Sequence, residues 1–443
     1  MPRTLLTARR TVPLALIGVL TALALASGGC GDTSGTTSYT NPITTNTAGA
    51  IINAATLVKW VDEGKVNAPF GTADRVVIVS VTTPALFTST TKRHIPDAVL
   101  LNYSSELTTI REEGLGPNGV MMATGPMMDA LIQKLGIDGS TTIVFTIPKG
   151  STDSEHLQAA VAFWTFRYWG FARERVKLLN GGDDAWEAAG QPLTDAVVSV
   201  TPSTYSVTGN KVLKDTLRTS VGEMLTTIDS INRDQSLRST WQFLDVRGYT
   251  VSPYLANAFR GNGPMQFITD RVNGESTRNR LYPDAATLRT RLSSSPVYDG
   301  PNVAYMSPDK KTIVMCGTST NCAPAWVLYD AVLGVPEGNI ASYDGSSGQW
   351  NSYSFAKIKA AGATDAQANN WAFDAVTSGT TLTRAIGTLP APVPGENPFI
   401  PGNFIYLPSQ PEANQIEVAD KAYISATNGG STTPGGGGPS GGC

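Results

Sequence analysis

Apolar runs, polar loops and helical stretches follow one another in a repeated order along the middle of this chain. Residues 142–146 and 312–316 form two mostly apolar runs without alternation, which is typical of strands buried on both faces of a parallel sheet. Each run is followed by a polar loop and then by a helical stretch, near 157–168 in the first case and near 323–333 in the second. The pattern predicts two strand–loop–helix units.

The two units also continue alike. A glycine ends each helical stretch, and a second short apolar run follows at 176–179 and at 340–343. An Asn-Gly or Asp-Gly turn comes next, and a tryptophan, Trp186 or Trp350, stands five residues after the glycine of that turn. Strands that alternate with helices in this way predict an α/β fold with a mainly parallel sheet in each copy.

Several motifs in these units resemble the rhodanese family in its tandem sulfurtransferase arrangement. Residues 93–99 are similar to the family's G-H-I-P-G-A motif, and residues 178–190 to its L-D-G-G…W-x-A-A-G motif. Residues 243–247 resemble its L-[IL]-D-x-R strand, and residues 314–317 its V-x-Y-C-G segment. The resemblance implies two tandem rhodanese-like domains, each a mainly parallel sheet flanked by helices.

The two copies differ where the family carries its catalytic cysteine. The first copy has Thr146 at that position, and the run 80–82 replaces the family's D-x-R. We therefore expect the first domain to be non-catalytic. The second copy has Cys316, although it lacks a legible H-I-P-G-A motif and its region 261–282 does not align.

Cys316 combines the features that sulfur transfer requires. It ends an apolar strand, where ligand crevices of α/β sheets form, and it precedes a helix start, whose dipole lowers a thiol pKa. We expect an exposed thiolate there, with Asn321 as the helix cap. The alternative is a buried free cysteine that packs as a small apolar side chain. The loop whose amides are expected to cradle a persulfide or oxyanion consists of Gly317, Thr318, Ser319, Thr320 and Asn321.

Two further residues follow from the resemblance. Asp245 and Arg247 end a neighbouring strand, and Arg247 is expected to bind an anionic substrate by a bidentate contact. The alternative is a structural Asp–Arg pair. Because the loop 316–322 contains neither Arg nor Lys, it does not decide between a thiosulfate and a 3-mercaptopyruvate donor.

Cys322 stands six positions after Cys316, where a phosphatase-type loop would need an arginine for phosphate. This argues against the phosphatase branch of the fold. Two thiols across one loop predict that Cys322 resolves a persulfide or selenyl intermediate by forming a disulfide. A static disulfide in an oxidising compartment is the alternative.

The N-terminus indicates export. Positive charges at Arg3, Arg9 and Arg10 precede an apolar stretch at 12–27, which is typical of a signal peptide. Small residues then run into Cys30, so we expect a bacterial lipobox with Cys30 acylated, although Ser27 stands where a leucine is usual. The alternative is ordinary cleavage nearby. The expected location is the cell envelope, with a lipid anchor in the inner or outer membrane, periplasmic or surface-facing.

The composition of the chain argues against some classes of binding partner. A net charge of -3 and 16% charged residues leave no polybasic surface for nucleic acid. With two histidines and four cysteines, a multi-histidine metal site is excluded, and no cofactor is expected. The predicted division of the chain is a signal peptide at 1–29, a flexible lipoprotein tether at 30–48, a non-catalytic rhodanese-like domain at 49–200, a second rhodanese-like domain at 217–386, a Pro-rich extension at 387–428 and a disordered Gly-rich tail at 429–443.

The resulting hypothesis is an exported sulfurtransferase that moves sulfur or selenium through a persulfide on Cys316. Its expected partners are a small sulfur or selenium donor and the membrane. The overall resemblance to rhodanese-like lipoproteins associated with selenite and tellurite reduction implies extracytoplasmic multihaem cytochromes as further partners. The alternative is a non-catalytic accessory lipoprotein of such a reduction or electron-transfer complex.

Overall fold

The computed structural model describes twelve parts of the chain, all within one compact unit of residues Pro42–Cys443. The predicted signal peptide, the tether with Cys30, Arg247, Trp350 and the Gly-rich tail lie outside the described residues. The described residues are 49–113, 117–151, 153–224, 227, 235–245, 258–260, 270–271, 280–294, 307–349, 376–377, 380–381 and 414–426.

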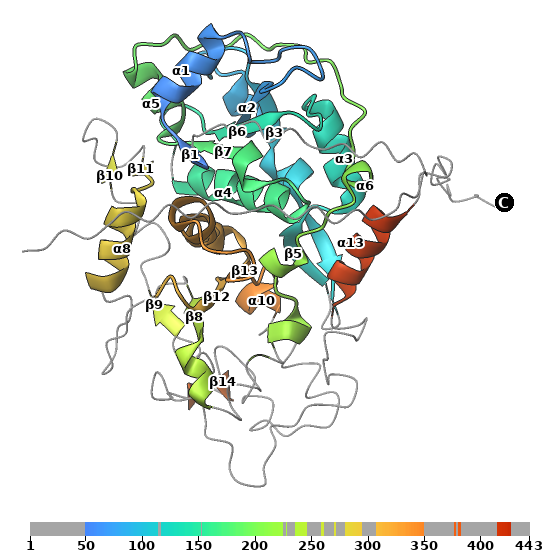
Figure 1. Ribbon diagram of the computed structural model, residues 1–443, viewed down its shortest axis with the longest axis vertical. Coiled ribbons are helices and arrows are strands. Elements are labelled where there is room, and N and C mark those ends of the chain that lie inside the picture. The colour runs from blue at the N-terminus through green and yellow to red at the C-terminus, as the bar shows by residue number, and fades with distance from the viewer. Residues whose placement is uncertain are drawn as a thin grey trace, which may run out of the picture. The chain divides into compact units, whose positions relative to one another are not determined.

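The first repeat forms a five-stranded sheet in which all neighbouring strands run parallel, in the spatial order β1–β7–β6–β2–β3 (Figure 1). The strands β2 and β6 are buried along their whole length, as expected for a sheet covered on both faces. The strand bounds are β1, Ile51–Ile52; β2, Val76–Thr82; β3, Val99–Asn102; β6, Thr142–Thr146; and β7, Val176–Leu179.

Helices flank this sheet. In the first of them, Asn53 accepts a hydrogen bond from the Thr56 backbone nitrogen, which caps the helix. The long central helix begins at Asp153, four residues before the predicted start, and Gly170, at φ 94°, follows its end. The helix bounds are α1, Ala54–Asp62; α2, Pro84–Phe87; α3, Gly125–Lys134; α4, Asp153–Tyr168; α5, Gly182–Ala188; and α6, Val207–Asn210.

The second repeat forms a four-stranded parallel sheet in the order β13–β12–β8–β9. This order matches β7–β6–β2–β3, so the sequence repeat is also a repeat of structure. The fold class predicted from the sequence, an α/β fold with a mainly parallel sheet flanked by helices in each copy, is confirmed. The bounds are β8, Trp241–Asp245; β9, Ala258–Arg260; β12, Lys311–Met315; β13, Ile340–Ser342; α8, Ala285–Ser294; α9, Ala323–Val327; and α10, Ser346–Gln349.

An antiparallel strand pair follows β3 in the first repeat and β9 in the second. The first pairs β4 (Thr108–Glu112) with β5 (Pro117–Met122), and a π-helical turn η1 (Tyr103–Leu107) precedes it. The second pairs β10 (Asp270–Arg271) with β11 (Arg280–Leu281), in the region where no family motif aligned. The repeat therefore extends beyond the motifs that reveal it in the sequence.

The two repeats share a buried interface built on α4 and α9. The rings of Phe163 and Trp326 lie 6.2 Å apart across it. Arg167 and Asp330, both fully buried, form an ion pair at 3.2 Å in the same layer. After α9 the chain continues as a π-helical turn η8 (Leu328–Leu333), which ends at Gly334 in the left-handed conformation, as the predicted stop signal requires.

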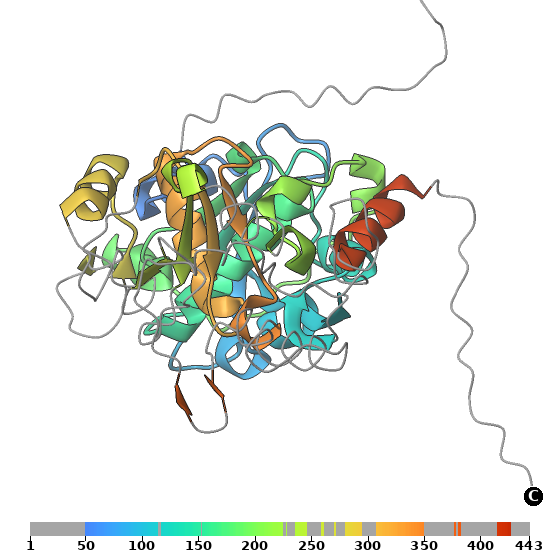
Figure 2. The same cartoon turned by 90° about the horizontal axis from the view of Figure 1, so that it is seen from below.

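A C-terminal helix, α13 (Gln415–Ser425), lies inside the stretch predicted as a Pro-rich extension. It packs against α3, α6 and β4 of the first repeat, as Figures 1 and 2 show from two sides. None of the helices among the described residues has the length and apolar character needed to cross a bilayer. The remaining elements are η2, Arg173–Arg175; η3, Asp215–Leu217; η4, Gln235–Ser239; η7, Thr320–Cys322; β14, Val376–Thr377; and β15, Thr380–Thr381.

Candidate active site

Cys316 stands at the carboxyl edge of the second sheet. It follows β12 directly, and β12 lies between β13 and β8, so the cysteine is at the centre of the edge where ligands bind in parallel sheets. Its thiol is expected from the sequence to be exposed, but only 1% of Cys316 is accessible to solvent. The prediction of an exposed thiol is therefore wrong for this conformation, because parts of the first repeat lie on the loop.

The hydroxyl of Ser346 lies inside the loop that Cys316 begins. Its oxygen accepts hydrogen bonds from the backbone nitrogens of Cys316 at 3.2 Å and Ser319 at 3.3 Å. The same hydroxyl lies 2.8 Å from the Tyr343 carbonyl oxygen and 3.9 Å from the Cys316 sulfur, and its one proton can be donated to either acceptor. Two of the converging loop amides are thus bound by a side chain from α10.

The surroundings of Cys316 favour its ionised form. Burial alone raises the pKa of a thiol, and this is the largest single effect on Cys316. Hydrogen bonds to the sulfur outweigh it and lower the pKa of Cys316 from 9.0 to about 7. The donors, in order of effect, are the Cys322 thiol, the backbone N–H groups of Thr318 and Cys322, and the Ser346 hydroxyl.

Cys322 behaves in the opposite way. Burial and its hydrogen bond to Cys316 raise the pKa of the Cys322 thiol well above its ordinary value. Its sulfur also lies 2.7 Å from the Ser319 carbonyl oxygen and 3.5 Å from the Ser342 hydroxyl. Both cysteines are free thiols. Of the two, Cys316 is the one that ionises near neutral pH.

The helix start differs from the sequence prediction. Asn321 does not cap α9, because the loop enters the helix through the 3₁₀ turn η7, whose N-cap is Ser319 at φ 69°. Cys322 takes the N-cap position of α9, where no side chain supplies a cap hydrogen bond, and Pro324 lies in the first turn. The 3₁₀ turn itself satisfies the amide of Ala323, which donates to the Thr320 carbonyl.

Two hydrogen bonds between described residues join the first repeat to the loop. The Tyr103 hydroxyl lies 3.0 Å from the Thr320 hydroxyl, and the Ser319 hydroxyl donates to the Val120 carbonyl at 2.8 Å. Burial raises the pKa of Tyr103, which keeps its phenol neutral at physiological pH. Sequence reasoning missed Tyr103, because it stands 217 residues before its partner and belongs to no motif.

The two residues carried over from the D-x-R motif are only partly described. Asp245 ends β8 and pairs with Met315, so its backbone lies beside the start of the loop. Its side chain and the whole of Arg247 lie outside the described residues. The substrate contact assigned to them stays a prediction.

A different arginine is found near the thiols. Arg218 is buried, and its Nε donates to the Asp344 carboxylate at 2.9 Å. Asp344 and Ser346 belong to the turn that follows β13 and enters α10, which is the Asp-Gly turn of the repeat. An alignment of the two copies would have singled out Ser346, because Gly182 takes its place in the first copy.

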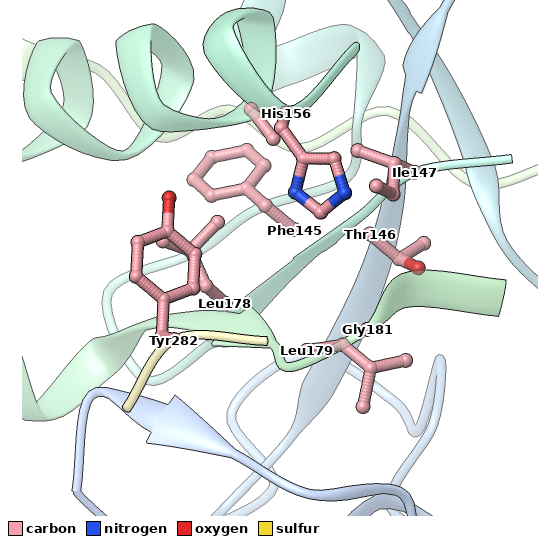
Figure 3. A pocket seen from close by; sticks show the side chains of 9 residues that line it. Phe145, Thr146, Ile147, His156, Leu178, Leu179, Gly181 and Tyr282 are labelled. Carbon is pink, nitrogen blue, oxygen red and sulfur yellow. The ribbon is translucent and has the colours of Figure 1, made fainter. Parts of the chain in front are cut away.

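The equivalent position in the first repeat contains no thiol. Thr146 donates to the buried Asp183 carboxyl at 2.6 Å, and burial raises the pKa of Asp183 well above its ordinary value. A small pocket of about 260 Å³, including its opening, lies beside Thr146. Figure 3 shows His156 of α4 and Tyr282, from the second repeat, around the same space. No cluster of three or more metal-ligating side chains occurs among the described residues.

The chain is similar in sequence to curated proteins that are named for sulfur transfer. No protein-family model matches the chain. It is 27% identical over 231 residues to the sulfur carrier protein TtuD of Thermus thermophilus, covering 50% of this chain and 71% of that protein. It is 25% identical over 306 residues to a putative thiosulfate sulfurtransferase of Haloferax volcanii, covering 68% of this chain and 92% of the relative.

One solved structure matches the chain at low similarity. The 3-mercaptopyruvate sulfotransferase SseA of Escherichia coli, described as having the rhodanese fold, matches with a TM-score of 0.45 and 17% identity over 68% of this chain and 99% of that one. The chain is thus similar in sequence to proteins named for sulfur transfer, and each of its two repeats contains a parallel sheet. The two curated relatives named above are a sulfur carrier and a thiosulfate sulfurtransferase.

Proposed function

We propose that this protein is a sulfurtransferase that carries sulfur, or selenium, on Cys316. The observation that carries the proposal is the position of this thiol: it lies at the carboxyl end of β12, in a loop bound by the Ser346 hydroxyl, and its surroundings lower its pKa to about 7. About half of it is ionised at pH 7, and the thiolate is the nucleophilic form of cysteine. The names of the curated relatives support sulfur transfer as the reaction class.

The first step loads the cysteine. The Cys316 thiolate attacks the outer sulfur of a donor such as thiosulfate, the sulfur–sulfur bond of the donor breaks, and sulfite leaves with the electron pair of that bond. A cysteine persulfide remains on Cys316. With 3-mercaptopyruvate the carbon–sulfur bond breaks instead, and the carbon takes up a proton to give pyruvate.

The second step discharges the persulfide, and Cys322 is placed to take part. Cys322 lies at the other end of the same loop, and its thiol is one of the groups that lower the pKa of Cys316. Attack of the Cys322 sulfur on the inner sulfur of the persulfide forms a Cys316–Cys322 disulfide and releases hydrosulfide. A dithiol reductant then restores both thiols. The raised pKa of Cys322 makes this step slow until an acceptor or base removes its proton.

The place of action rests on the N-terminal sequence. The positive charges, the apolar stretch and the small residues before Cys30 support export and acylation at that cysteine. We also propose that the protein acts on selenium oxyanions or their reduced products, next to extracytoplasmic cytochromes. This part of the proposal rests on the overall resemblance to lipoproteins associated with selenite and tellurite reduction.

Mass spectrometry of the reduced protein tests the proposal. Exposure to thiosulfate, 3-mercaptopyruvate or selenite in separate reactions is expected to add sulfur or selenium to the peptide that contains Cys316 with at least one of them. Cys316→Ser should abolish the addition. Cys322→Ser should keep the adduct and slow its loss, since no internal thiol remains. An unmodified Cys316 with all three donors would contradict the assignment.

A second candidate is a non-catalytic accessory protein. The burial of Cys316 favours it, because a closed site with two of its amides bound to Ser346 has no open path to a substrate. Such a protein would form no adduct with any donor but would still bind a chalcogen species or a partner. The same mass measurement therefore separates the two candidates.

A further inference from the structure

The strand β4 buries the charged side chain of Arg111, and the residue directly after the strand buries a second charge. Ile110 is 71% exposed, whereas Arg111 on the opposite face is 8% exposed and Glu113, directly after the strand, is fully buried. Successive residues of a strand point to opposite faces, so Arg111 and Glu113 share the inner face. An unpaired buried charge is strongly unfavourable, so each of these two must have a partner.

The partner of Arg111 comes from the C-terminal helix. Its two terminal nitrogens donate to both carboxylate oxygens of Asp420 in α13, at 3.0 and 2.6 Å. The Tyr168 hydroxyl donates to the same carboxylate at 3.0 Å. All three groups are buried. The inner face of β4 is therefore bound to a segment more than 300 residues further along the chain.

The partner of Glu113 comes from the link between the repeats. Arg218 donates to both Glu113 oxygens, at 3.0 and 2.9 Å, and the Val221 nitrogen donates at 3.2 Å. The third contact of Arg218 is Asp344, in the turn that precedes Ser346. A chain of buried ion pairs thus joins β4 to the turn that organises the catalytic loop.

The segment that carries these charges also lies on the loop. We call the described residues 103–113 and 117–122 the covering segment; it comprises η1, β4 and β5. Its first part contacts Thr320 through Tyr103, and its last part contacts Ser319 through Val120. Cys316 is only 1% exposed, and these contacts are among those that cover its loop.

The attachment of α13 depends on polar groups. The residues that it buries are Ile416, Asp420 and Ile424, so a charge occupies the middle of its contact face. Tyr423 adds a hydrogen bond to Asp129 at 2.7 Å. With two apolar side chains buried in eleven residues, α13 belongs to the class of elements that open locally before the core does.

We propose that α13 controls access to Cys316 by holding the covering segment closed through the Asp420–Arg111 ion pair. When α13 detaches, Arg111 loses its buried partner and its charge favours exposure to solvent. The strand β4 then leaves the interface, and the contacts of Val120 and Tyr103 with the loop separate. The proposal concerns access to the thiol and does not depend on which donor is used.

The test uses the full-length reduced protein and the variant Asp420→Asn, which removes the charge and keeps the shape. Cys316 is labelled by a bulky maleimide well below the unfolding temperature, and each cysteine is read by peptide mass. Labelling of Cys316 should accelerate by about tenfold or more in the variant, because the pair that closes the segment is broken. The control is Glu417→Gln on the same helix, whose carboxylate pairs with the exposed Lys421 and not with β4.

Hydrogen exchange on the same samples separates local opening from general destabilisation. Amides of α13 and β5 should exchange faster together in Asp420→Asn, while those of β2 and β6 keep their parental rates. If Asp420→Asn fails to fold, Tyr423→Phe, which removes the hydrogen bond to Asp129, should give a smaller change of the same pattern. Faster exchange of α13 with unchanged β5 exchange and unchanged labelling of Cys316 would overturn the proposal. Donor adducts are not measured, so the outcome is separate from that of the sulfurtransferase proposal.

Discussion

The Ser346 hydroxyl accepts the backbone N–H of Cys316 at 3.2 Å, across thirty residues of sequence. Ser346 has φ 51°, in the left-handed region that favours glycine, and the first repeat has Gly182 at φ 58° in the same place. A serine side chain is disfavoured in this conformation by roughly 1–2 kcal/mol. The hydrogen bonds of the hydroxyl to the loop offset that cost, which makes Ser346 a positioning residue for Cys316.

Replacement of Ser346 by glycine tests this role. Ser346→Gly relieves the backbone strain but removes a donor to the sulfur and the acceptor of two loop amides. The pKa of Cys316 should then rise above about 7. Each unit of that rise lowers the thiolate fraction at pH 6 about tenfold, and labelling by iodoacetamide should slow accordingly. Ser239→Ala, at an exposed serine before β8, is the control. An unchanged pH profile in Ser346→Gly would show that the hydroxyl does not act on the thiol.

The thiol pair predicts a difference in pH dependence. As pH rises, the labelling rate of Cys316 should increase with a midpoint of about 7 and then level off, because its thiolate fraction saturates. Cys322 should label slowly throughout this range, because burial and its bond to Cys316 raise its pKa. The measurement is iodoacetamide labelling from pH 5 to about 8.5. An ordinary thiol is mostly protonated throughout most of this range, because its pKa is about 8.5. Equal rates for both cysteines would contradict the assignment of Cys316 as the nucleophile.

The hydrogen bond from Cys322 to Cys316 predicts different results for two variants. Cys322→Ser retains a donor and should keep the midpoint of Cys316 close to about 7. Cys322→Ala removes the donor and should raise the midpoint. Both variants lack the resolving thiol, so both should hold a persulfide longer than the parent does. A persulfide that decays at the parental rate in both would exclude Cys322 from the discharge step.

Substitution of Thr146 in the first repeat should change the stability of the protein but not its sulfur-transfer activity. Thr146→Ala leaves the buried Asp183 oxygen without its donor at 2.6 Å, which should lower the free energy of unfolding by about 1–3 kcal/mol. Sulfur transfer should stay within a few-fold of the parent, because the site of the first repeat contains no thiol. Thr146→Ser keeps the hydroxyl and should be close to the parent in both measurements. If Thr146→Ala lost as much activity as Cys316→Ser, the assignment of catalysis to the second repeat would be wrong.

The lipid anchor is tested separately. Cys30→Ala should move the exported protein from the membrane fraction to the soluble envelope fraction, since no acyl acceptor remains. Immunoblots of fractionated cells give the result, with the Cys443→Ala variant as control. Retention of Cys30→Ala in the membrane fraction would contradict acylation at this position.

The parts of the fold that depend on local pattern were predictable from the sequence. The strands at 142–146 and 176–179 were predicted with their observed bounds, and the strand before Cys316 within one residue, because buried strands of a parallel sheet are continuous apolar runs. The repeat then placed Cys316 at the carboxyl edge of a sheet. The helix cap at Asn321 was wrong, because a 3₁₀ turn, which periodicity does not reveal, begins the helix.

The sequence by itself determined the two α/β repeats, the nucleophile candidate and the loss of a thiol in the first repeat. Only the tertiary structure decided that Cys316 is closed off, that Ser346 organises its loop, and that buried ion pairs connect the loop with the C-terminal helix. The physical reason is that these contacts join residues 30 to more than 300 positions apart. Burial and pKa depend on which distant side chains meet, whereas hydrophobic periodicity reports only on neighbours along the chain.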